Sequence, residues 1–279
     1  TCGSIRVPSA HNNLVGLRGT QGLSSRFGIV PLSSTQDIGG PLARSVRDLA
    51  ITLDVTVGFD RNDPQTAASV GKIPESYRAA LTMLDPSTLR LGVLVDRFGT
   101  DPEEIELGNR IKALLGKLQA EGSTVIEVAD PQVYASLVET PFFVSEFDFR
   151  KDMTAYLAAN PSLGFPSLKA LLDDPRIVTN VASLLRPLLG PAHESELAYL
   201  RQRARRTDTR GALLTLMHEY RLDALVYPTA TREAVEIGGQ HTHFNCILAA
   251  NSGLPAISVP AGFGAHGMPI AIEFLAESW

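Results

Sequence analysis

The feature that most restricts the fold is a strand–helix–strand succession. The apolar run Leu89–Val95 is typical of a buried strand. An N-cap acid followed by proline, Asp101 and Pro102, predicts the start of a helix that runs to about Glu121. A second strand is predicted over Ser123–Val128. This spacing predicts two parallel strands joined by a right-handed crossover, which places the chain in the α/β class.

The remaining segments fit that class. Ser45 predicts the N-cap of a helix that ends at Gly58. Residues 1–41 are predicted to form loops and short strands, because they show little helical periodicity. The block at about 132–220 is predicted to be helical, either as a lid-like insertion or as a cover for one face of the sheet. Beyond it we expect strands at 224–227, 255–259 and 270–274 and a helix at about 243–251.

Composition excludes several functions. With 44% hydrophobic and 20% charged residues, the chain has the profile of a globular protein with a sizeable core. The net charge of -5 argues against nucleic acid as a partner. No apolar run approaches the ~20 residues needed to cross a membrane. Two cysteines are too few for a disulfide framework. A cytoplasmic location is expected, although a missing N-terminus would take any export signal with it.

The octet Thr1–Pro8 is the strongest indication of chemistry. Ser4 follows a small, glycine-containing turn and precedes an apolar-basic-apolar run. Successive backbone N–H groups in such a turn can point at one spot and hold a developing oxyanion. Residues with little or no side chain let a carbonyl group approach the backbone. The pattern favours a serine nucleophile beside an oxyanion hole.

The octet resembles the Thr-Asp-x-Gly-Gly-Ser-Ile-Arg-x-Pro core of the amidase signature family. Further blocks match the family in order, over roughly residues 1–70 and 220–275, and more weakly over the helical middle. These blocks are Gly16–Thr20, Ser24–Pro31, Ser33–Asp37, Gly40–Asp48, Asp223–Thr229 and Asn251–Gly262. The segment 146–152 looks more like stand-alone and peptide-amidase-like members than like the amidotransferase member of the family.

The resemblance implies a layered α/β/α fold around a mixed sheet, formed by residues 1–279 as one catalytic-type domain. It implies hydrolysis of a carboxamide through an acyl-enzyme on Ser4, with the backbone N–H groups of Thr1, Cys2 and Gly3 in the oxyanion hole and no metal or organic cofactor. The substrate would be a small-molecule or peptide amide, and a homodimer is left open. A second interpretation makes Cys2 the nucleophile, and the family has glycine at that position.

In the family, a lysine and a bridging serine activate the nucleophile, and both lie upstream of this motif. No lysine of this chain stands in a matching context; all five, at 72, 112, 117, 151 and 169, are expected on the surface. The chain therefore resembles the C-terminal part of an amidase, with the N-terminal part missing, and we expect residues 1–279 to be inactive alone. Two alternatives are the glutaminase-type subunit of the tRNA-dependent amidotransferase and a non-catalytic binding fragment.

Three other residues carry expectations. Arg6 suits a structural salt bridge more than a contact with a substrate carboxylate. Gln36 and Asp37 either reach the rim of the active site or tether a loop. We expect Ser4 to lie near a pocket whose wall includes these two residues and the segment 251–262.

Three patterns favour no special function. His241 and His243 would share a face of a strand, but two ligands do not make a metal site. The basic run Arg201–Arg206 is expected to be a solvated helix face, with a phosphate- or substrate-facing patch as the alternative. The spacing of Gly16, Gly19 and Gly22 does not fit a dinucleotide-binding motif.

Overall fold

The computed structural model of the chain describes residues 3–82, 85–129, 144–190, 195–239 and 241–279. Its centre is a seven-stranded sheet in the order β2-β1-β6-β7-β5-β3-β4. The strands are β1 (Val15–Arg18), β2 (Leu42–Ala43), β3 (Arg90–Leu94), β4 (Thr124–Val128), β5 (Ala224–Pro228), β6 (Ala256–Phe263) and β7 (Pro269–Leu275). β3 is parallel to both β4 and β5, and the other pairs are antiparallel. The mixed sheet confirms the predicted fold class.

Helix α4 (Pro102–Ala120) is the predicted crossover between β3 and β4. A capping box closes its first turn, in which the Glu104 side chain accepts from the backbone N–H of Asp101 at 3.1 Å. Helix α2 (Val46–Thr56) begins as predicted after Ser45, whose hydroxyl accepts from the N–H of Asp48 at 3.1 Å. Both helices start where a side chain satisfies an otherwise unpaired backbone donor.

The main core lies between the sheet and its helices. Leu107, Ile111 and Leu115 of α4 pack with Leu213 and Met217 of α9 (Glu196–Tyr220) and with the central strands. α1 (Arg6–His11) contacts β1, β6 and β7, and α10 (Ile247–Ser252) contacts α9. The short helix α3 (Tyr77–Ala80) packs beside α2.

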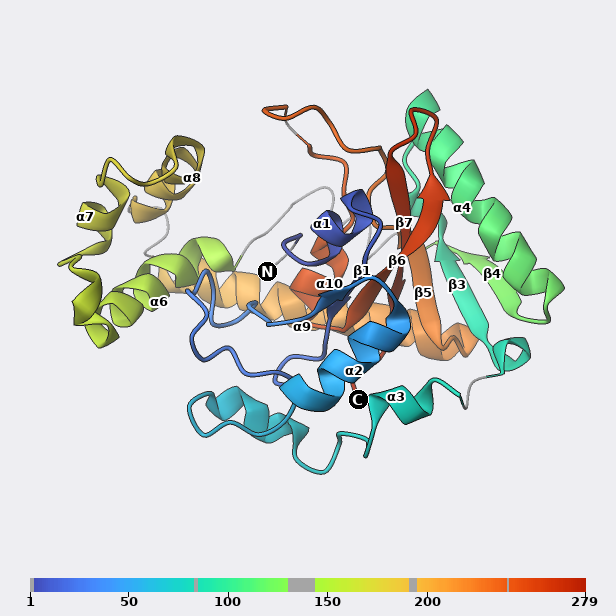
Figure 1. The fold of residues 1–279 in the computed structure, drawn as a ribbon, viewed down its shortest axis with the longest axis horizontal. Helices are drawn as coiled ribbons and strands as arrows, with labels where there is room; N and C mark the ends of the chain where they lie inside the picture. The colour runs from blue at the N-terminus through green and yellow to red at the C-terminus, as the bar shows by residue number, and fades with distance from the viewer. Residues whose placement is uncertain (1–2, 83–84, 130–143, 191–194, 240) are drawn as a thin grey trace.

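The described part of the middle block is helical, as predicted, while residues 130–143 and 191–194 lie outside the described residues. It contains α6 (Ser145–Ala159), α7 (Leu168–Leu172) and α8 (Thr179–Leu185). These helices form a second apolar cluster centred on Phe149 and Met153, apart from the main core. Figure 1 shows α7 and α8 extending away from the sheet on the side opposite α4. Whether this block acts as a lid stays a prediction.

Two sequence predictions were wrong. The first 41 residues include a helix, α1, which is only six residues long and so leaves no clear periodicity. Helix α10 begins at Ile247 instead of about 243, because backbone hydrogen bonds keep the preceding residues extended. The N–H of Thr231 donates to the His243 carbonyl at 2.9 Å, and the N–H of Asn245 donates to the Thr229 carbonyl at 3.0 Å.

No helix within the described ranges is long and apolar enough to cross a membrane.

Candidate functional site

Gly3 and Ser4 form a turn that leads directly into α1. The N–H of Val7 donates to the Gly3 carbonyl at 3.0 Å, which ties the turn to the helix. A Cβ atom on Gly3 would lie 3.1 Å from Cγ2 of Val7 and 3.8 Å from Sγ of Cys246. The small residue therefore lets the turn lie close to the residue that precedes α10. The Ser4 side chain is exposed, so it is accessible to a substrate.

The other predicted residues of this turn, Thr1 and Cys2, lie outside the described residues. Their backbone role in an oxyanion hole, and the alternative in which Cys2 is the nucleophile, stay predictions.

Arg6 anchors α1 in the core. Its guanidinium forms an ion pair with Glu273 on β7, and both side chains are 0% exposed. It also donates to the Cys246 carbonyl at 2.9 Å. The Tyr227 hydroxyl on β5 donates to the same Glu273 oxygen at 2.9 Å. Because Arg6 is fully buried, it supports the turn from beneath and is not placed to meet a substrate carboxylate.

Burial shapes the acidity of this cluster. It raises the pKa of the Glu273 carboxyl group, with the charge of Arg6 acting in the opposite direction. It also raises the pKa of the Tyr227 hydroxyl well above its ordinary value, and the charge of Glu273 adds to that effect. The tyrosine therefore acts as a hydrogen-bond donor that helps compensate the buried carboxylate.

Gln36 ties its loop to α10 and β1, and Asp37 holds the loop together from within. The Gln36 amide donates to the Asn251 side chain of α10 at 2.7 Å, and its backbone carbonyl accepts from Arg18 at 3.1 Å. The Asp37 carboxylate accepts from the backbone N–H groups of Leu32 and Ser33 at 2.7 Å each. Burial, followed by repulsion from other arginines, lowers the pKa of Arg18 to about 9. These contacts are the loop-tethering kind.

The structure brings together the two segments expected around Ser4. The loop at Gln36 contacts Asn251 directly. Asp37 lines a cavity of about 420 Å³ against α6, but that cavity does not include Ser4. This cavity therefore does not form a common pocket of Ser4 and Asp37.

The two histidines singled out by the sequence serve different contacts. His243 lies 3.0 Å from Glu104 of α4, and Thr231 donates to the same carboxylate oxygen at 2.7 Å. The His241 ring packs against His11 of α1 with a centroid distance of 4.7 Å. Segment 241–243 is not a strand, and the described residues include no group of three or more His, Cys, Asp or Glu able to hold a metal ion.

Sequence reasoning missed Glu273 and Tyr227 as supports of the site. One signal was present for Glu273, because it is a charged residue inside the apolar strand run 270–274, where an unpaired charge would be costly. The partner it selects could not be read from the sequence, because Arg6 lies 267 positions away.

Comparison with known proteins places the chain among amidases. The profile of the Amidase family matches residues 1–279. Mandelamide hydrolase of Pseudomonas putida is 30% identical over 98% of this chain and 53% of its own length. A glutamyl-tRNA(Gln) amidotransferase subunit of Acinetobacter baylyi is 28% identical over 100% of this chain and 58% of its own length.

Among solved structures, the native peptide amidase of Stenotrophomonas maltophilia superposes with a TM-score of 0.79 at 29% identity. The match covers 99% of this chain and 57% of that one. The chain thus spans a little over half the length of the relatives it matches.

Proposed function

This chain belongs to the amidase signature family, and we propose that it carries the nucleophile of an enzyme that hydrolyses carboxamides. In this proposal Ser4 attacks the amide carbonyl, the amine or ammonia leaves, and water then hydrolyses the acyl-serine. The observation that supports it most is the exposed Ser4 on a turn braced from below by the buried Arg6–Glu273 ion pair. Rigid support of this kind keeps a nucleophile in a reactive geometry.

The backbone of the turn would stabilise the negative charge that develops on the carbonyl oxygen. We propose the N–H groups of Thr1, Cys2 and Gly3 as oxyanion donors. One such donor is worth about 2.7–4 kcal/mol of transition-state stabilisation.

A general base is needed as well, because a serine hydroxyl is a weak nucleophile until its proton is removed. A lysine can serve only when it is held neutral, which requires burial or neighbouring positive charge. All five lysines of this chain are exposed, and two of them, Lys112 and Lys169, pair with acids. We therefore assign the base to the lysine–serine pair that the family places ahead of this motif.

The substrate is proposed to be a small-molecule or peptide amide. Support comes from the mandelamide hydrolase and the peptide amidase among the relatives. No cofactor is needed for this chemistry, because the serine, the base and the backbone donors supply every step.

Covalent labelling tests the nucleophile. The protein expressed from its complete gene should react with a fluorophosphonate probe, and Ser4→Ala should abolish both the labelling and amide hydrolysis. Ser183→Ala, at an exposed serine of α8, controls for the loss of a hydroxyl and should leave both intact. Labelling that persists in Ser4→Ala, or activity lost only in Cys2→Ser, would move the nucleophile elsewhere.

A second candidate is the glutaminase-type subunit of the tRNA-dependent amidotransferase, supported by the 28% identity to the Acinetobacter baylyi protein. Glutamine hydrolysis that appears only with a second protein chain favours this candidate. Hydrolysis of simple amides by the protein alone favours the first.

The inactivity of residues 1–279 alone also stays a prediction. Expressing these residues beside the product of the complete gene tests it. Equal amide hydrolysis by both would show that a general base lies within residues 1–279.

A further inference from the structure

A basic cavity lies between α9, α6 and the loop at residues 34–35, and the proposed chemistry does not use it. Its volume is about 620 Å³. Four cationic side chains line it: Arg26, Lys151, Arg203 and Arg206. Hydroxyl groups of Ser34, Thr35, Tyr199 and Thr207 complete much of the wall, and none of the described residues that line it is acidic.

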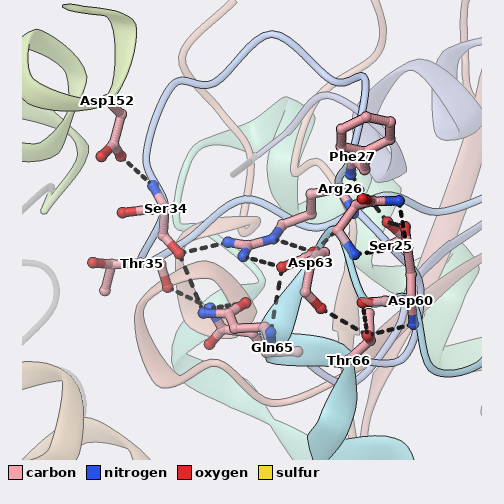
Figure 2. Close-up of polar contacts among 12 residues, drawn as sticks. Ser25, Arg26, Phe27, Ser34, Thr35, Asp60, Asp63, Gln65, Thr66 and Asp152 are labelled. Atoms are coloured by element: carbon pink, nitrogen blue, oxygen red, sulfur yellow. Dashed lines mark hydrogen bonds and ion pairs between the residues drawn. The ribbon is translucent and has the colours of Figure 1, made fainter. Parts of the chain in front are cut away.

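Of these four cations, Arg26 is paired with an acid, Asp63. Its guanidinium lies between Asp63 and Ser34, as Figure 2 shows. It donates to the two carboxylate oxygens of Asp63 at 2.9 and 2.7 Å and to the Ser34 carbonyl at 2.7 Å. Arg26 therefore shapes the wall of the cavity and adds little net charge to it.

Arg206 brings a buried charge to the cavity. Its side chain is only 8% exposed. It donates to the carbonyl groups of Ala250 and Thr35, at 2.5 and 3.4 Å. Carbonyl oxygens satisfy N–H groups without cancelling a positive charge. Burial first, and then repulsion from Arg203 and Arg210, lower the pKa of Arg206 to about 10 against the opposing charge of Asp148. An anion in the cavity would relieve this repulsion.

Lys151 and Arg203 are the accessible cations. Both side chains are exposed, and neither forms an ion pair with another described residue. Arg203 lies over the Tyr199 ring at 5.8 Å, which limits where its guanidinium can go. They come from two different helices, so an anion between them could be held from two sides.

Two acids near the cavity, Asp148 and Asp152, accept hydrogen bonds from other groups. Asp148 accepts from the hydroxyls of Ser33 and Tyr199 at 2.5 and 2.7 Å. Asp152 accepts from the backbone N–H of Ser34, a contact drawn in Figure 2. Neither acid lines the cavity. Within the part of the wall that the structure describes, the three cations Lys151, Arg203 and Arg206 have no acidic residue beside them on the cavity surface.

We propose that this cavity binds the phosphate group of a small molecule, with Lys151 and Arg203 as the direct ligands of the anion and Arg206 as the buried charge behind them. Charge-assisted hydrogen bonds from a guanidinium and an ammonium suit the oxygens of phosphate. The hydroxyl groups of Ser34 and Thr35 can add neutral donors. A small molecule fits better than a nucleic acid, because the chain as a whole is acidic. This site is independent of the amide chemistry proposed for Ser4.

Phosphate binding to the protein expressed from its complete gene tests the inference. Inorganic phosphate and glycerol 3-phosphate serve as two probes, measured by calorimetry and by thermal shift at constant ionic strength. We expect both to bind and to raise Tm. Tighter binding of glycerol 3-phosphate than of phosphate identifies a monoester as the natural class, and equal binding identifies free phosphate.

The variant Arg203→Gln/Lys151→Gln should weaken binding by roughly tenfold or more, since each charge-assisted hydrogen bond lost costs about that factor. Both side chains are exposed, so this variant should still fold. Arg201→Gln removes an exposed charge from the same helix outside the cavity and should bind like the parent. No binding of either probe overturns the proposal. An equal loss of binding in Arg201→Gln overturns it as well, because it shows that only general charge attraction holds the anion.

Discussion

Arg6, two residues after Ser4 in the chain, forms an ion pair with Glu273 that is completely closed to solvent. The pair connects α1 to β7, and Tyr227 adds a hydrogen bond from β5. The turn that carries Ser4 is therefore fixed to the central strands. The position of this turn therefore depends on the buried ion pair between Arg6 and Glu273.

Glu273→Gln should strongly destabilise the protein. The substitution leaves the Arg6 charge buried without its counter-ion, and breaking a buried pair in this way costs about 3–5 kcal/mol of unfolding free energy. Urea denaturation of the parent and the variant measures the loss. Because the Ser4 turn rests on this pair, fluorophosphonate labelling at Ser4 should also slow.

Glu106→Gln is the matched control, since it breaks an exposed ion pair with Arg110 on α4. Such pairs contribute about 0–1 kcal/mol. Similar losses in the two variants would mean that the buried pair has no special structural weight.

The sequence was sufficient for the elements whose signals are local. Helix α4 and strands β3 and β4 lie within one residue of their predicted bounds, because a cap, a proline and an apolar run each act on neighbouring residues. Helix α1 was missed because its six residues are held by packing on β1 and not by a periodic pattern.

The contacts of the site depended on chain folding and could not be predicted. The sequence favoured a salt bridge for Arg6 but could not name Glu273. The solvated-face interpretation of the basic run fits the exposed Arg201 and Arg203 but is wrong for Arg206. Arg206 is buried because the carbonyl groups of Thr35 and Ala250, remote in the sequence, satisfy its N–H groups.

Gly16→Ala should displace α1 from β1. A Cβ atom at this position would lie 2.1 Å from the Ser9 hydroxyl oxygen and 3.1 Å from the Ile5 carbonyl oxygen. Overpacking of this kind costs typically about 1–3 kcal/mol. We expect a lower Tm and slower labelling of Ser4. Gly116→Ala on α4 has no atom within 4 Å of its new Cβ and should stabilise the protein by roughly 0.5–1 kcal/mol. A Gly16→Ala variant as stable as the parent would show that α1 is not held tightly.

Glu104→Gln should change the acid stability of the protein. Although burial acts to raise it, hydrogen bonds from Thr231, the backbone of Asp101 and Thr100, and His243 lower the pKa of Glu104 to about 2. A lowered carboxyl pKa contributes stability that is present above the ordinary value of 4.5 and is lost as the pH falls toward 2. The variant should be less stable at neutral pH and lose less between pH 4.5 and 2. Unfolding by urea across that range measures both effects.

The exposed neighbour Glu103→Gln is the control for this experiment, and its acid profile should follow that of the parent. If Glu104→Gln shows the same slope as the parent, the hydrogen-bonded carboxylate does not govern acid unfolding.

The paired rings of His11 and His241, tilted by 46° with centroids 4.7 Å apart, should make stability depend on pH below 6.5. Burial, and then the neighbouring imidazole charges, lower the pKa of both side chains from 6.5. A lowered histidine pKa means that the unfolded chain binds protons first, so stability is present above pH 6.5 and falls as the pH drops toward the lowered values. His243, Arg232 and Glu233 also act on His241, the last two through their backbone.

His241→Phe should therefore reduce this dependence, because phenylalanine keeps a ring between His11 and Phe244 and cannot take up a proton. We expect Tm of the parent to fall between about pH 7.5 and about pH 5 and Tm of the variant to fall less. His218→Gln, at an exposed position of α9, controls for the loss of an imidazole. Parallel profiles for the parent and His241→Phe would show that the paired rings of His11 and His241 do not couple protonation to folding.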